Sequence, residues 1–164
     1  MRERAGRWAV GGLAALLVGL LVALGLVVIR QDDADAGLTT AQQDVAAAAR
    51  AEALAFLTVD HRDMDPLVDA VLEGATGDFA KQYASQRRTL TKEAVRTEAT
   101  STPEVVALGV GDQDDRSATV LVAANSTVTN AATGDEGQVR YYRLRLRLVR
   151  EDDRWLTSDL QFVR

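Results

Sequence analysis

His61, the only histidine of the chain, is the first candidate for acid–base chemistry. It lies between Asp60 and Asp63, and a histidine flanked by carboxylates suits a general acid or base. A metal site at this position would depend on carboxylates alone, because the chain has no cysteine. The spacing of Asp60, Asp63 and Asp65 lacks the alternation and the glycine of a calcium-binding loop. We therefore interpret this segment as an exposed turn between two helices.

The common catalytic motifs do not occur in the sequence. The nucleophile motif G-x-S-x-G, the phosphate-binding loop G-x-x-x-x-G-K and the dinucleotide-binding loop G-x-G-x-x-G are all missing. Gly109 and Gly111 lack the third glycine of a dinucleotide-binding loop. The sequence therefore predicts a protein that is not an enzyme, with no cofactor and no metal ion.

A basic stripe is the second candidate site. In the predicted strand 138–150, Arg143, Arg145 and Arg147 alternate with leucines, so all three arginines lie on one face. One interpretation is an ordinary solvated face whose arginines meet acidic residues on neighbouring strands. The other is a docking site for an acidic partner or for anionic lipid head groups.

The candidate residues lie in a segment, 40–164, that shows helical periodicity first and strand periodicity after it. This order predicts an α+β domain. Thr40 is the expected N-cap of the first helix, with Gln43 completing a capping box. The period changes from 3.6 to 2 after Pro103, where Val106, Leu108 and Val110 alternate with smaller residues. We expect about three helices packed on one face of a curved four-stranded antiparallel sheet. The expected helices are 40–57, 66–74 and 79–98, and the expected strands are 104–110, 117–129, 138–150 and 154–163.

Residues 8–29 form an apolar segment without a charged side chain, which predicts a transmembrane helix. Arginines precede it and aspartates follow it, so the positive-inside rule places residues 1–7 in the cytoplasm. Residues 30–39 are then a juxtamembrane linker to an extracytoplasmic domain, and the expected location is the plasma membrane. A cleaved signal peptide is the alternative, but its apolar region is usually about 7–15 residues long.

Small residues recur at every fourth position of the apolar segment. This spacing lets two membrane helices approach closely and predicts a packing face toward a partner helix. The members of this face are Gly11, Ala15, Gly19 and Ala23.

The charge of the chain argues against nucleic acid as a partner. The formal net charge is −5, and the four arginines among residues 1–30 leave the remainder more acidic still. An acidic domain repels the phosphate backbone, so we expect no binding to DNA or RNA.

The order of these features resembles the Mce-associated membrane proteins of actinobacteria, over nearly the whole chain. The matching segments are the anchor, ALAFLTVD (53–60), DMD (63–65), GATGDF (74–79), ATVLVA (118–123) and RWLTSDL (154–160). The resemblance implies a cone-shaped fold like that of nuclear transport factor two. It also implies a non-catalytic role supporting Mce lipid-import complexes, with Mce subunits and membrane lipid as partners.

Three other functions fit the same layout. A lipid- or sterol-binding module would use the interior of the cone, with a cavity lined by Phe56, Tyr83, Tyr142 and Leu144. A type IV secretion inner-membrane subunit would combine a similar anchor and cone. An isomerase-like enzyme would need a base such as Asp60 or His61 to meet Tyr83 inside the cone.

Overall fold

The computed structural model describes residues 38–134 and 136–164. The predicted transmembrane helix and its small-residue face (Gly11, Ala15, Gly19 and Ala23) lie outside the described residues. Within the described residues, no helix has the length and apolar character needed to cross a bilayer.

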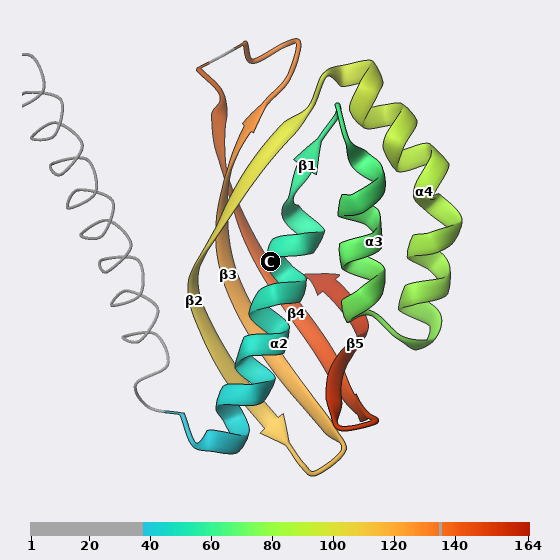
Figure 1. The fold of residues 1–164 in the computed structure, drawn as a ribbon. Helices are drawn as coiled ribbons and strands as arrows, with labels where there is room; N and C mark the ends of the chain where they lie inside the picture. Colours follow the sequence, from blue (N-terminus) through green and yellow to red (C-terminus); the bar gives the residue numbers. More distant parts are fainter. Residues whose placement is uncertain (1–37, 135) are drawn as a thin grey trace, which may run out of the picture. The chain divides into compact units, whose positions relative to one another are not determined.

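The described part of the chain contains three helices and one five-stranded antiparallel sheet. The helices cover one face of the sheet, and the strands follow the order β1-β2-β3-β4-β5 (Figure 1). The α+β class is therefore confirmed, with one strand more than predicted. The elements are α2 (Thr40–Leu57), β1 (Val59–Asp60), α3 (Met64–Gly74), α4 (Gly77–Thr97), β2 (Thr100–Gln113), β3 (Ser117–Thr129), β4 (Gln138–Glu151) and β5 (Arg154–Phe162).

The helix starts differ from the predicted ones by one to two residues. Thr39, not Thr40, is the N-cap of α2: its hydroxyl accepts from the backbone N–H of Gln42, whose side chain accepts from the N–H of Thr39. The capping-box pattern T-x-x-Q occurs at both 39–42 and 40–43, and the first of the two forms the capping box. Helix α3 begins at Met64, so Pro66 lies in its first turn, where a missing N–H leaves no helical bond unmade.

The main core lies between α2 and the inner face of the sheet. Val45, Ala49 and Ala53 of α2 pack against alternate residues of β3 and β4, all of them buried. Small alanines at these positions bring the helix close to the strands. A second cluster around Met64, Val68 and Ala94 joins α3 to α4.

Two register shifts interrupt the pairing of β2 with β3. One lies between Val105 and Ala107, the other between Val110 and Gln113. Strand β3 pairs with β4 continuously from Ser117↔Val149 to Val128↔Gln138. This regular pair holds the basic stripe on the face opposite the helices.

Candidate functional site

Strand β4 separates apolar and basic side chains as the sequence predicts. Leu144, Leu146 and Leu148 are 0% exposed, whereas the intervening arginines, Arg143, Arg145 and Arg147, are exposed. The arginines face away from the helices, and their partners in register on β3 are Ala123, Leu121 and Thr119.

The guanidinium groups of the stripe are not neutralised by acidic side chains of the described residues. Arg145 donates to the side-chain oxygen of Gln161, and none of the three arginines forms an ion pair within residues 38–134 and 136–164. Asp159 lies opposite Arg147 in register, but its Oδ2 accepts from Nε2 of Gln161 at 2.8 Å. The stripe is solvated, as the first interpretation expects, but the expected pairing of its arginines with acids on neighbouring strands is not seen among the described residues.

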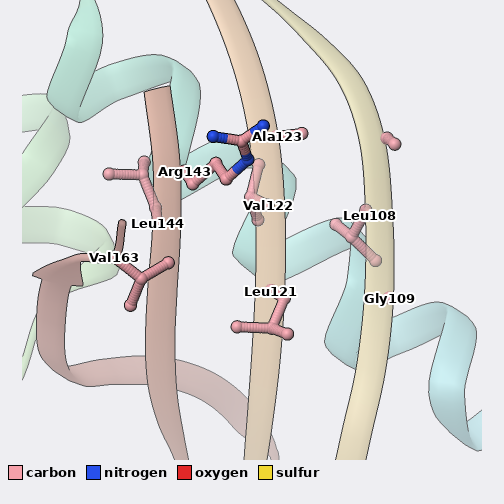
Figure 2. Close-up of a pocket in the computed structure, with 9 residues that line it drawn as sticks. Leu108, Gly109, Leu121, Val122, Ala123, Arg143, Leu144 and Val163 are labelled. Carbon is pink, nitrogen blue, oxygen red and sulfur yellow. The ribbon is translucent and has the colours of Figure 1, made fainter. Parts of the chain in front are cut away.

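An apolar hollow of about 350 Å³ adjoins Arg143 on the same face (Figure 2). The hollow exists because Ala107, Gly109 and Ala123 have small side chains or none. Leu121 and Val163 border it. Leu121 of β3 is 54% exposed. Tyr141, which lies on the same side of β4 as the three arginines, is 79% exposed. We call the stripe and this hollow together the outer face.

The residues predicted to line a cavity do not all meet in one pocket. Phe56 and Tyr83 line a pocket of about 460 Å³ with Phe79 and Leu160, and the rings of Phe56 and Tyr83 are 5.9 Å apart. Tyr142 does not line this pocket, but the centroid of its ring is 6.0 Å from that of Phe162, which is itself 6.0 Å from the ring centroid of Phe56. Leu144 belongs to the core between sheet and α2 and also adjoins the outer hollow.

Asp60 and His61, the candidate acid–base residues, form local contacts at the turn that follows β1. The carboxylate of Asp60 accepts from the guanidinium of Arg62 at 2.9 and 2.7 Å, and these bonds hold the pKa of Asp60 well below its usual range. The Nδ1 atom of His61 lies 3.3 Å from the carbonyl oxygen of Ala99. Asp60 and His61 are not among the residues lining the pocket of Tyr83. Within the described ranges, no group of three or more His, Asp or Glu side chains is placed to hold a metal ion.

Helix α2 also buries a carboxyl group, that of Glu52, which is not among the predicted site residues. Glu52 is 3% exposed, and neither of its carboxyl oxygens has a hydrogen-bond partner among the described residues. Burial raises the pKa of Glu52 to about 8. Burial, and to a lesser degree the charge of Glu52, raises the pKa of Tyr83. The signal was present in the sequence, because Glu52 follows Val45 by seven residues and Ala49 by three, on the buried side of the helix.

Solved structures that share this arrangement of helices and sheet include proteins of bacterial type IV secretion systems. CagV, a VirB8 homologue from Helicobacter pylori, matches with a TM-score of 0.59 at 7% identity, covering 74% of this chain and 97% of CagV. The periplasmic domain of DotI matches at 0.58 and 12% identity, covering 77% and 98%. An IcmL-like type IV secretion protein from Legionella pneumophila matches at 0.56 and 13% identity, covering 77% and 94%. At these identities the likeness shows a shared fold.

A sequence relative comes from Mycobacterium tuberculosis. The protein Rv1363c is 29% identical over 118 residues, which cover 72% of this chain and 45% of the relative. The match thus spans less than half the length of that relative. The model of the family described as "Uncharacterized protein Rv1363c/MT1408-like" matches residues 9–164, nearly the whole sequence. The chain therefore belongs to the Rv1363c/MT1408-like family.

Proposed function

We propose that this protein is a non-catalytic, membrane-anchored accessory subunit whose extracytoplasmic domain docks onto an envelope protein complex. The observation that carries the proposal is the outer face, where three exposed arginines form no ion pair among the described residues and one of them, Arg143, lines an apolar hollow. In this proposal residues 8–29 anchor the chain in the plasma membrane.

The outer face fits a partner that presents an acidic group beside an apolar side chain. The apolar side chain would fill the hollow beside Leu121 and Val163, and the acid would meet Arg143 or its neighbours on β4. Buried apolar area supplies most of the affinity, while charge complementarity supplies orientation and association rate. Because the rest of the domain is acidic, an acidic partner is attracted to this face and repelled elsewhere.

We further propose that the partner is a subunit of an Mce-type lipid-import complex. The resemblance to Mce-associated membrane proteins and the mycobacterial relative support this choice. The alternative is an inner-membrane subunit of a type IV secretion-like assembly, which the fold of CagV, DotI and the IcmL-like protein favours. Genes for Mce subunits or for secretion subunits beside the gene of this protein would distinguish the two.

Crosslinking in membranes tests the docking. The full-length chain carrying Arg143→Glu, Arg145→Glu and Arg147→Glu is compared with wild type and with Arg88→Glu, an exposed arginine of α4. Wild type and Arg88→Glu should crosslink to Mce subunits, which mass spectrometry identifies. The crosslinking yield of the triple variant should be at least about tenfold lower. Equal crosslinking by all three chains would refute docking through the outer face. Crosslinks to secretion-type subunits alone would favour the alternative.

A second candidate function is lipid or sterol binding by the domain. The pocket of about 460 Å³ beside Phe56 and Tyr83 favours it, because aromatic and aliphatic side chains predominate in its lining. Native mass spectrometry of the full-length protein extracted from membranes should then show a bound lipid. The fraction of protein that carries this lipid should be lower in Tyr83→Ala. Protein that carries no lipid would count against this function and leave the docking proposal intact.

A further inference from the structure

A third pocket, separate from the hollow of the outer face and from the pocket of Tyr83, lies between α2, α3 and the start of β5. Its volume is about 480 Å³, and three alanines of α2 and one of α3 form its apolar wall. Glu52 and Trp155 also line it, and Glu73 and Arg154 lie at its exposed rim. The pocket therefore combines an apolar wall, an aromatic ring and a buried carboxyl group.

Glu52 is the feature that needs an explanation. A buried carboxyl group without a hydrogen-bond partner destabilises a protein, and an alanine or leucine would fill this helix position without that cost. Both oxygens of Glu52 are unpartnered among the described residues, although the group is 3% exposed. Such a group is stabilised when a ligand supplies the missing hydrogen bonds.

We propose that this pocket binds a small organic cation, whose primary ammonium group donates hydrogen bonds to the carboxylate of Glu52. An ammonium group has three N–H donors, and the two carboxylate oxygens of Glu52 have no hydrogen-bond donor among the described residues. Trp155 offers the ligand an apolar and cation-attracting ring face, and the alanines leave room for a compact hydrocarbon body.

Binding of such a cation is coupled to release of a proton. Burial keeps Glu52 protonated up to about pH 8, so below that pH the group must lose its proton to solvent when the ammonium binds. Three other ionisable groups are near Glu52: Glu73 from α3, Arg154 from β5 and Tyr83 from α4. The charge of Glu73 favours binding of the cation, and the charge of Arg154 opposes it. The affinity should therefore rise about tenfold per pH unit from pH 6 to 7 and level off above about 8.

The test uses a matched pair of probes, cyclohexylammonium and cyclohexanol, on the full-length chain in lipid nanodiscs. The chain has two tryptophans, so Trp8→Phe leaves Trp155 as the fluorescent reporter of the pocket. Cyclohexylammonium should bind with the stated pH dependence and should quench or shift the emission of Trp155, whereas cyclohexanol should bind at least about tenfold more weakly at pH 8.

Variants assign the effect to Glu52. Glu52→Gln should weaken cyclohexylammonium at least about tenfold and remove its pH dependence, whereas Glu73→Gln should change the affinity less than about threefold. Equal binding of both probes, or binding by Glu52→Gln with unchanged pH dependence, would overturn the proposal, as would no binding of cyclohexylammonium at any pH. If Glu52→Gln does not fold, the pH dependence in wild type decides the question. Crosslinking through the outer face is independent of these outcomes.

Discussion

The carboxyl group of Glu52 occupies the space that a side chain at Gly74 would need. A Cβ atom added at Gly74 would lie 2.1 Å from Oε2 of Glu52. No real contact is that short, so the absence of a side chain at the end of α3 is what allows α2 to bury its carboxyl group there. The two positions are thus coupled in packing.

Gly74→Ala should destabilise the domain by about 2 kcal/mol, because the new methyl group displaces the buried carboxyl group. The backbone is not the cause, since Gly74 does not have a positive φ. In a Glu52→Ala background, the same substitution should be neutral or stabilising, because alanine is a better helix former than glycine. Urea unfolding of the four chains measures this coupling. Equal costs in both backgrounds would contradict the packing explanation.

The free energy of unfolding should fall as the pH rises from about 4.5 to about 8. In this window the folded chain keeps the proton of Glu52, whereas the unfolded chain has released it at the ordinary value of 4.5. The folded state then binds more protons, and stability decreases by at most about 1.4 kcal/mol per pH unit.

Urea unfolding at a series of pH values measures this slope, and Glu52→Gln should remove most of it. Asp60, Glu93 and Asp114 have pKa values lowered by their hydrogen bonds, so the stability that they contribute is lost only below about pH 4.5. A slope that persists in Glu52→Gln would assign the effect to another group.

The capping box of α2 offers a test with a built-in control. Thr39→Ala removes the hydroxyl that accepts from the N–H of Gln42 and should cost about 1 kcal/mol of stability. Thr40→Ala, one residue further along, should change stability by less than about 0.5 kcal/mol, because Thr40 is an exposed first-turn residue. A larger loss from Thr40→Ala would place the cap where the sequence first suggested it.

A buried pair of hydroxyls connects β2 to β3. The Oγ atoms of Ser101 and Ser126 are 2.6 Å apart, and both residues are buried. Either single change to alanine should destabilise the domain by about 1 kcal/mol, because the remaining hydroxyl loses this partner. The double change should cost less than the sum of the single ones, which a double-mutant cycle in urea would show. Additive costs would mean that the two hydroxyls do not depend on each other.

The periodic elements were predictable because burial imposes a period on them. In β4 the leucines must face α2 to be buried, and the arginines then have one possible side. The same reasoning placed α2, α3 and α4 to within about two residues, because caps and apolar stripes mark the ends and faces of helices.

Local exceptions to these periods were not predictable. Val106 is 54% exposed, because the register shift between Val105 and Ala107 turns Val105 toward the core instead. Strand β1, with two residues, is too short to show a period. Glu52 was missed for a related reason: a charged side chain is assigned to solvent by default, and only the packing of α2 against α3 shows that it is buried.

The order of the strands has a consequence for how the protein avoids aggregation. Strand β1 pairs with Thr100 and Ser101 alone, so the rest of β2 forms an open edge of the sheet. An open edge is a template on which strands of other molecules can add. Pro103 removes a backbone donor from this edge, and two register shifts interrupt its regular course, so a foreign strand finds few consecutive donors and acceptors in line. The irregularities of β2 thus limit edge-to-edge association of this domain with other molecules.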